Sequence, residues 1–304
     1  MMRILITGSN GFVSQKFCEQ FKAENRPGAL LGVSKSTNRN PNLKSTEFQQ
    51  IDLSDFEALN RLLVTFKPTH ILHTAAVTAV ETCEQRPERA QQLNVDLTAF
   101  LGAYAKEQGC HLTFISTDFV FDGIAGPYLE TDPTNPKNVY GSTKVEAEQR
   151  LLALGGSMAI LRTILLYGAV ADLQRSNLVL WAKKQLEANL PIDVVSDQWR
   201  MPTWVDDLAQ ACWLSMVQRA EGIFHISGNE MLSIEEAVRQ VADFWNLDKT
   251  QITPISSAQI GQADNRPQRT GFSIEKAKKV LGYNPTAFVV SLQEIDKQLK
   301  AYLQ

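Results

Sequence analysis

The sequence predicts an α/β fold in which a doubly wound parallel sheet is joined to a smaller, mixed α/β C-terminal lobe. As far as about Arg162, short apolar runs rich in β-branched residues alternate with helical stretches. This alternation is typical of a parallel sheet covered by helices on both faces. The first apolar run leads at once into a glycine turn and a helical pattern, which is the order of elements in a nucleotide-binding domain.

The first strand is expected at Arg3–Thr7, directly before the glycine turn. Gly8 permits the tight turn, and Gly11 lets the backbone approach a pyrophosphate at the N-terminus of the following helix. The spacing is Gly-x-x-Gly-x-x-Ser, and we expect the Ser14 hydroxyl to bond to the carbonyl of Asn10. The pattern therefore predicts a Rossmann-like cofactor site at Gly8, Asn10, Gly11, Phe12 and Val13.

The second strand is expected at Ala29–Val33, and the residues after it indicate which cofactor is preferred. An enzyme that prefers NADH usually places an acid there for the ribose 2′-hydroxyl, but residues 25–46 contain none. Ser34 and Lys35 follow the strand instead and suit a 2′-phosphate. We therefore predict NADPH, with NADH less favoured; the alternative is a solvated basic loop.

The third and fourth apolar segments add residues to the expected cofactor site. The third ends at Gln50–Leu53, where Asp52 either accepts from the adenine amino group, with Leu53 beside it, or caps the next helix. The fourth begins at His70 and runs into small residues that would admit a cofactor: Thr74, Ala75 and Ala76. No third ligand lies near His70 and His73, so no metal site is predicted.

A second pattern indicates catalysis. A hydroxyl residue, Thr117, follows the apolar run Leu112–Ile115, and Tyr140 stands four residues before Lys144. On a helix these two side chains share one face, so the ammonium is expected to lower the pKa of the phenol. Such a tyrosine can give a proton to a forming alkoxide. The alternative is a surface tyrosine that lies on a lysine stem.

The expected organisation has two parts. Residues 1–169, completed by about 196–227, form the NADP-binding domain, and residues 170–195 with 228–304 form a substrate-binding lobe. The strand Ile223–Ile226 returns to the large sheet. Helices are expected at 11–24, 55–66, 87–108, 138–154, 173–189, 205–218, 233–246, 273–281 and 290–303.

Composition excludes several classes of protein. The formal net charge of −3 over 304 residues implies no broad basic face for nucleic acid. No apolar run approaches the ~18 residues that a membrane span needs. Cys18, Cys83, Cys110 and Cys212 lack metal or redox spacing and are expected to be reduced thiols. The chain begins directly in a strand, so we expect a cytoplasmic protein.

Several segments, in order, share their pattern with a known family: Ile6–Gly11, Ala75–Pro87, Asn94–Val95, Ser116–Gly123, Tyr140–Lys144 with Glu148, Leu161–Thr163, Asp197–Thr203, Asp207–Ala209 and Arg266–Pro267. From Met2 to about Tyr283 the chain resembles the extended short-chain dehydrogenase/reductases. Within them it is most similar to the dTDP-4-dehydrorhamnose reductase family. The resemblance implies a role in dTDP-rhamnose biosynthesis for cell-wall polysaccharide, and a possible homodimer.

The resemblance also implies a reaction and residue roles. NADPH would deliver hydride to the C4 ketone of a nucleotide-linked 4-keto-6-deoxy sugar. Tyr140 would protonate the C4 oxygen, and Thr117 would orient the same oxygen. Lys144 would lower the pKa of Tyr140 and hold the nicotinamide ribose, so that Tyr140 and Lys144 also belong to the implied cofactor site. The remaining implied residues are Asn94, for the backbone or a proton relay, Asp118, against the sugar, and Arg266, for the substrate diphosphate.

Two departures from the family pattern fall where the sugar nucleotide is expected. Leu165 stands where the family commonly has a tryptophan, and Arg200 replaces a glycine. Because of these two departures, the sequence does not determine which nucleotide and which sugar the substrate contains. An epimerase or dehydratase of the same superfamily is one alternative, although the acid that an epimerase usually has after the second strand is absent, and Phe119 follows Asp118 where a dehydratase needs a second acid. A non-catalytic NADP-binding regulatory subunit is another, although such proteins often lose the tyrosine or lysine that this chain keeps.

Overall fold

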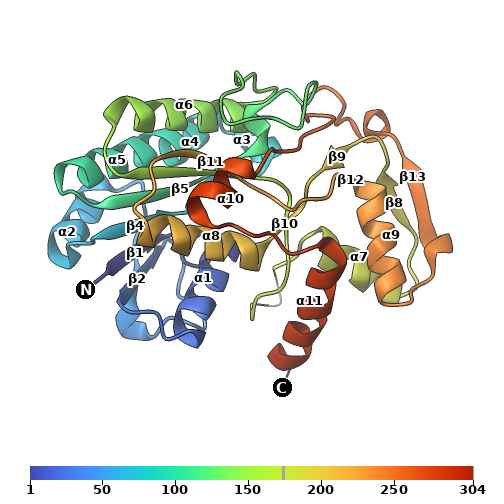
Figure 1. Ribbon diagram of the computed structural model, residues 1–304, viewed down its shortest axis with the longest axis horizontal. Helices are drawn as coiled ribbons and strands as arrows, with labels where there is room; N and C mark the ends of the chain where they lie inside the picture. Colours follow the sequence, from blue (N-terminus) through green and yellow to red (C-terminus); the bar gives the residue numbers. More distant parts are fainter. Residues whose placement is uncertain (173–174, 304) are drawn as a thin grey trace.

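The computed structural model describes residues 1–172 and 175–303 and shows a larger and a smaller lobe (Figure 1). The larger lobe contains a parallel sheet of seven strands in the order β11-β6-β5-β4-β1-β2-β3. The predicted doubly wound α/β fold is therefore confirmed. The strands of this sheet are β1 Arg3–Thr7, β2 Ala29–Ser34, β3 Phe48–Gln50, β4 His70–His73, β5 His111–Thr117, β6 Met158–Thr163 and β11 Gly222–Ile226.

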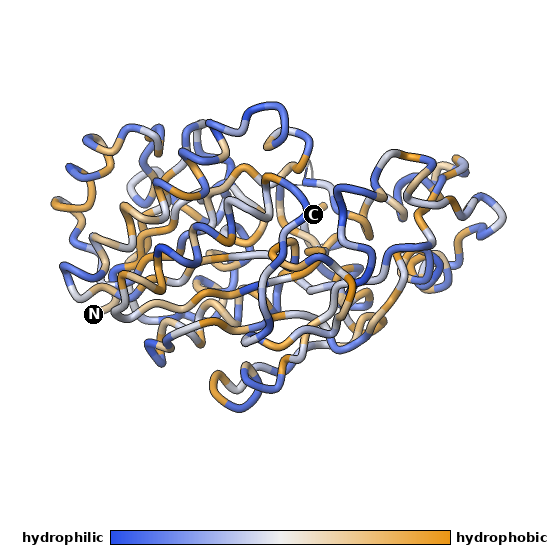
Figure 2. Tube along the Cα trace, turned by 90° about the horizontal axis from the view of Figure 1, so that it is seen from above, coloured by the Kyte–Doolittle hydropathy of each residue, from blue (hydrophilic) through white to orange (hydrophobic). Residues whose placement is uncertain are grey.

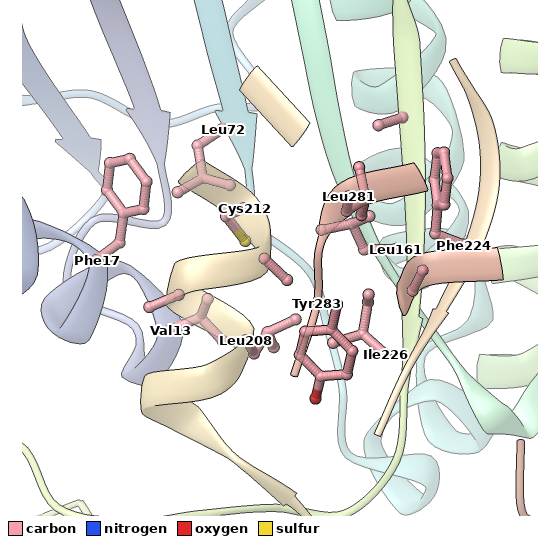
Figure 3. Close-up of a cluster of buried hydrophobic side chains, with 14 of the residues drawn as sticks. Val13, Phe17, Leu72, Leu161, Leu208, Cys212, Phe224, Ile226, Leu281 and Tyr283 are labelled. Carbon is pink, nitrogen blue, oxygen red and sulfur yellow. The ribbon is translucent and has the colours of Figure 1, made fainter. Parts of the chain in front are cut away.

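Helices cover both faces of this sheet (Figure 1). One face packs against α1 and α8, and Figure 3 shows Phe17 of α1 and Cys212 of α8 in that buried cluster. The other face packs against α2, α5 and α6. The helices of the larger lobe are α1 Phe12–Ala23, α2 Phe56–Phe66, α3 Val80–Gln85, α4 Pro87–Ala90, α5 Leu97–Glu107, α6 Val139–Leu154, α8 Val205–Val217 and α10 Glu275–Leu281.

The smaller lobe has its own apolar core and lies beyond the carboxyl ends of the strands (Figure 1). Its helices are α7 Leu178–Glu187, α9 Ile234–Phe244 and α11 Phe288–Tyr302. Three short strand pairs complete the fold: β7 Leu166–Tyr167 with β10 Thr203–Trp204, β9 Trp199–Arg200 with β12 Leu232–Ser233, and β8 Ile192–Val195 with β13 Ile252–Ile255.

The C-terminal helix α11 joins the two lobes. Its residues Leu292 and Ile295 are buried in the core of the smaller lobe. At its end, the Tyr302 hydroxyl bonds to Glu19 and accepts from the buried ammonium of Lys16, both on α1. Helix α1, which begins at the glycine turn, is thus bonded to a helix of the smaller lobe.

Three helix predictions differ from the structure. The helix expected at 87–108 is divided by a π-helical segment, Gln91–Asp96, between α4 and α5. The helix α3 was not predicted, because its six residues are too few to show a helical period. The helix expected at 173–189 begins at Leu178 as α7, and residues 173–174 lie outside the described part of the chain.

Hydropathy follows this architecture. Hydrophilic and hydrophobic residues alternate along the helical coils of the trace (Figure 2), as expected for helices with one face on a core. Among the helices of the described residues, none is long and apolar enough to span a membrane.

Candidate functional site

A cavity of about 770 Å³ lies between the carboxyl edge of the large sheet and the smaller lobe. Many of the predicted site residues line it, namely Gly11, Phe12, Val13, Thr74, Ala76, Thr117, Asp118, Tyr140 and Arg266. Other predicted residues do not line the cavity but contact the segments that do: Gly8, Asn10, Ala75, Asn94 and Lys144. Four more lie at or just after the ends of β2 and β3: Ser34, Lys35, Asp52 and Leu53. The carboxyl edge of a parallel sheet is where ligands bind in doubly wound folds.

At Gly8 and Gly11, in the turn after β1, an added side chain would clash with main-chain atoms. Gly8 has a φ of +68°, and a Cβ placed there would lie 2.9 Å from Cα of Ala75. A Cβ at Gly11 would lie 2.9 Å from the Gly8 carbonyl oxygen. Helix α1 then begins without a side-chain cap and without an acid in its first turn. Its N-terminus therefore presents main-chain N–H groups and a positive dipole end to the cavity.

The expected bond from Ser14 to Asn10 is not present. The Ser14 hydroxyl lies 2.8 Å from the Thr74 hydroxyl, which in turn donates to the Thr7 carbonyl. The Asn10 carbonyl accepts instead from the Gln15 side chain. The third position of the turn thus ties α1 to the end of β4, because a short hydroxyl side chain fits between them.

Asn10 also orders the loop after β2. Its amide donates to the Ser36 hydroxyl at 3.0 Å and to the Thr37 carbonyl at 2.8 Å, and it accepts from the Arg39 main chain. The Ser34 hydroxyl is buried and accepts from the Asn10 main chain at 3.2 Å. The predicted cofactor residues Asn10 and Ser34 therefore shape the loop that would surround the adenosine end.

Two residues assigned to different parts of the cofactor form an ion pair with each other. The Lys35 ammonium lies 2.8 Å from the Asp52 carboxylate, and the lysine side chain is 70% exposed. The hydrogen bond from Lys35 is the main cause that holds the pKa of Asp52 below its usual range. Asp52 does not cap α2, because Asp55 accepts from the main chain of Ala58 in that role.

Tyr140 and Thr117 meet at the centre of the cavity wall. Tyr140 stands in the first turn of α6, which Asn138 caps by accepting from Gly141 at 2.7 Å. Burial raises the pKa of Tyr140, and a hydrogen bond from the Thr117 side chain acts in the opposite direction. The expectation of a lowered tyrosine pKa is therefore wrong for this structure.

Lys144 lies behind this wall. Its ammonium donates to the Ile115 carbonyl at 2.7 Å and lies over the Phe114 ring. Burial lowers the pKa of Lys144 to about 7, while the charge of Glu148 raises it. The ammonium is thus held by the main chain of β5, and its charge is not among the causes that shift the pKa of Tyr140.

The Asn94 side chain forms hydrogen bonds within the protein. Its side chain accepts from the Val77 main-chain N–H at 2.8 Å and donates to the Val77 carbonyl and to the Thr143 hydroxyl. Asn94 lies in the π-helical segment. It thereby joins the loop after β4 to helix α6, which carries Tyr140.

A buried charge cluster closes the other end of the cavity. The Arg200 guanidinium donates to the carbonyls of Trp199, Pro267 and Gln268 and lies 3.8 Å from the Asp118 carboxylate. Asp118 also accepts from the Thr270 hydroxyl at 2.5 Å. Burial raises the pKa of Asp118, and the Arg200 charge lowers it. Arg200, which stands where the family has a glycine, therefore fixes the position of the Asp118 carboxylate, the group expected to face the sugar.

Arg266 and Leu165 complete the lining at this end. Arg266 donates to Glu81 at 2.8 Å, so it forms an ion pair within the protein. Leu165 has a φ of +37° and lines the cavity where the family commonly has a tryptophan. Sequence reasoning missed two polar residues of the site: Thr270, which donates to Asp118 at this end, and Arg175, which donates to the Asn10 carbonyl at the glycine turn. No local motif contains either one.

Comparisons with known proteins identify relatives along the whole chain. The family model described as RmlD substrate binding domain matches residues 2–301. Methionine adenosyltransferase 2 subunit beta of Bos taurus is 31% identical over 297 residues, which cover 96% of this chain and 86% of that protein. A dTDP-4-dehydrorhamnose reductase structure from Clostridium acetobutylicum superimposes with a TM-score of 0.85 at 27% identity, over 98% of this chain and 100% of that chain.

A further structure shares the fold. The dTDP-4-dehydrorhamnose reductase of Bacillus anthracis, solved in complex with NADP, has a TM-score of 0.84 at 24% identity, over 98% of this chain and 100% of that one. The chain is thus similar both to reductases of nucleotide-linked sugars and to a subunit of another enzyme.

Proposed function

The chain belongs to the RmlD substrate binding domain family, and on that premise we propose that it binds NADPH and reduces the C4 ketone of a nucleotide-linked 4-keto-6-deoxy sugar. The resemblance to dTDP-4-dehydrorhamnose reductases seen in the sequence is confirmed by this membership. One observation carries the proposal: the glycine turn, Thr117 and Tyr140 face a single cavity large enough for a cofactor and a substrate.

The residues present fit a dinucleotide. A Cβ at Gly8 or Gly11 would fill the turn, and the N-terminus of α1 can accept phosphate oxygens. Phe12 and Val13 would donate their main-chain N–H groups to the phosphates. Lys35 would leave Asp52 for a 2′-phosphate, and Asp52 with Leu53 would border the adenine. We assign the cofactor to residues 1–169 with 196–227, and the substrate to 170–195 with 228–304, apart from helix α10, which packs in the core of the larger lobe.

Bound NADPH supplies a hydride, and this chain supplies the proton. As hydride reaches C4, negative charge grows on the ketone oxygen, and the Tyr140 hydroxyl gives it a proton to complete the alcohol. Because burial keeps Tyr140 protonated, it begins as the acid. Thr117 would orient the same oxygen. Lys144 would hold the nicotinamide ribose once its ammonium leaves the Ile115 carbonyl.

A second function is favoured by the opposite end of the cavity. Arg200 with Asp118, and Arg266 with Glu81, are ion pairs within the protein, so the residues expected to contact the sugar and the diphosphate already have partners. The relative from Bos taurus is named as a subunit. The second proposal is therefore an NADP-binding subunit that assembles with a methionine adenosyltransferase and performs no reduction.

Cofactor titration followed by a turnover assay tests both proposals. NADPH and NADH are titrated against the purified protein, and loss of NADPH absorbance is then followed with dTDP-4-dehydrorhamnose. Tighter binding of NADPH with turnover supports the reductase. Binding without turnover, together with co-elution with a methionine adenosyltransferase catalytic subunit, supports the second proposal. Failure to bind either cofactor contradicts both.

A further inference from the structure

Arg175 extends from the smaller lobe to the glycine turn of the larger one. It follows β7 and stands two residues before Asn177, which caps α7 by accepting from Leu180 and also donates to the Gly168 carbonyl at 2.9 Å. The nearby Ala169 is buried in the core of the smaller lobe. The arginine is therefore carried by the smaller lobe, close to a fixed helix start.

The guanidinium contacts the turn directly. Its Nη2 donates to the Asn10 carbonyl at 2.7 Å, and the side chain lines the cavity beside Gly11 and Phe12. Its Nε is buried and has no hydrogen-bond partner among the described residues, while the Asp172 carboxylate lies 3.6 Å away. One edge of the planar group thus borders the cavity at the point where α1 begins.

Two sources of positive potential meet at this point. The N-terminus of α1 has no side-chain cap and no acid in its first turn. The Arg175 guanidinium adds a positive charge beside it, which the Asp172 carboxylate offsets only from the Nε side. Among the described residues, the carboxylates that line the cavity are Glu81 and Asp118, and each faces another arginine, Arg266 or Arg200. A cation beside a helix N-terminus is unfavourable unless an anion lies between them.

We propose that Arg175 is a cofactor-binding residue that binds the dinucleotide pyrophosphate beside the glycine turn. The planar fork of a guanidinium matches two phosphate oxygens, and such charge-assisted bonds are among the strong ones. This assignment rests on the proposed NADPH site. It adds a ligand that no dinucleotide fingerprint contains, because the fingerprint uses main-chain N–H groups alone.

The position favours the cofactor over the substrate diphosphate. Arg175 bonds to Asn10, the residue directly before Gly11, whereas Arg266 bonds to Glu81 in the first turn of α3. Because Arg175 belongs to the smaller lobe, its bond to the pyrophosphate links that lobe to the cofactor domain through the ligand.

The test compares two ligands that differ in the pyrophosphate. NADPH contains it, whereas adenosine 2′-monophosphate shares only the adenosine and the 2′-phosphate. In Arg175→Gln, the Kd for NADPH is expected to rise roughly tenfold, while the Kd for adenosine 2′-monophosphate changes by less than about twofold. The matched control is Arg150→Gln, an exposed arginine on α6 that pairs with Glu146, and it should change neither value.

The outcomes separate this proposal from the proposed function. A wild-type protein that binds both ligands, with Arg175→Gln binding NADPH equally well, overturns the role of Arg175 alone. An equal loss for both ligands also overturns it, because the effect would then not come from the pyrophosphate. A wild-type protein that binds neither ligand overturns the NADPH site and this assignment with it. Since Arg175 is 35% exposed, its replacement is not expected to unfold the chain.

Discussion

The Arg200 guanidinium lies 3.8 Å from the Asp118 carboxylate, and the two side chains are 5% and 4% exposed. The pair joins β9 to the end of β5 across one end of the cavity. Because Arg200 also donates to three main-chain carbonyls, it holds the segment that carries Thr270 against the site. A glycine at this position could do neither.

Replacement of Arg200 by alanine should therefore destabilise the fold. Asp118 would lose its facing charge while remaining buried, and breaking such a pair from one side typically costs about 3–5 kcal/mol. We expect the free energy of unfolding, measured by urea denaturation, to fall by ~3 kcal/mol. Arg150→Ala, which breaks an exposed pair with Glu146, should cost less than about 1 kcal/mol.

A second change distinguishes the uncompensated charge from lost packing. Asp118→Asn, added to Arg200→Ala, removes the buried charge and should restore part of the lost stability. If the single variant Arg200→Ala is as stable as Arg150→Ala, the buried pair does not have the structural role assigned to it.

Gly8 should tolerate no side chain, and the chain offers a matched control. Gly8 and Gly109 have φ values of +68° and +62°, but an added Cβ meets the Ala75 main chain at Gly8 and nothing within 4 Å at Gly109. Both alanine variants bear the cost of the left-handed backbone. The free energy of unfolding of Gly8→Ala should fall by a further ~1–3 kcal/mol because of overpacking.

Calorimetric melting of the two glycine variants measures this difference. Gly8→Ala should also weaken NADPH binding, because relief of the clash moves the turn that faces the phosphates. Equal melting temperatures together with equal NADPH affinities would show that the turn has more room than the structure indicates.

Local spacing predicted the parts of the site that one segment supplies. The glycine turn and the pair formed by Tyr140 and Lys144 could be found because their residues lie within one turn or one helix. Arg175 reaches Asn10 across 165 residues, and Thr270 reaches Asp118 across 152. No periodicity links such distant positions, so only the packing of the two lobes reveals them.

Lys144 shows a different limit of sequence reasoning. The spacing correctly predicted that Lys144 and Tyr140 lie on one helix. It does not determine which atom the Lys144 ammonium contacts. In the fold, the Ile115 carbonyl on β5 accepts from it, because a buried ammonium needs an acceptor. The predicted pKa shift of the tyrosine was therefore wrong, although both residues lie on α6 as expected.

Tyr140→Phe should abolish most of the turnover and leave the cofactor bound. The change removes one hydroxyl, and loss of a general acid typically lowers the rate by about 10²–10⁴-fold. The Kd for NADPH, measured by fluorescence, should stay within about twofold of wild type. Tyr104→Phe is the control, since that hydroxyl donates to the Leu63 carbonyl, away from the cavity. Full turnover by Tyr140→Phe would exclude the proposed proton donor.

The stability of the cofactor-free protein should depend on pH through Lys144. Burial lowers the folded-state pKa of this lysine to about 7, from an ordinary value of 10.5. Between these two values the unfolded chain binds more protons than the folded one. Stability therefore rises with pH across this window, and below about pH 7 the cost of burying the ammonium is present in full.

A comparison with Lys144→Met isolates this effect, because the other titrating groups are common to both proteins. The unfolding free energy of wild type minus that of Lys144→Met should increase between about pH 7 and pH 10, with a slope of at most ~1.4 kcal/mol per pH unit. Urea denaturation at several pH values measures it. A difference that is constant or falls over this range would mean that Lys144 remains charged in the fold, in which case its ammonium could act on Tyr140 as the sequence pattern first indicated.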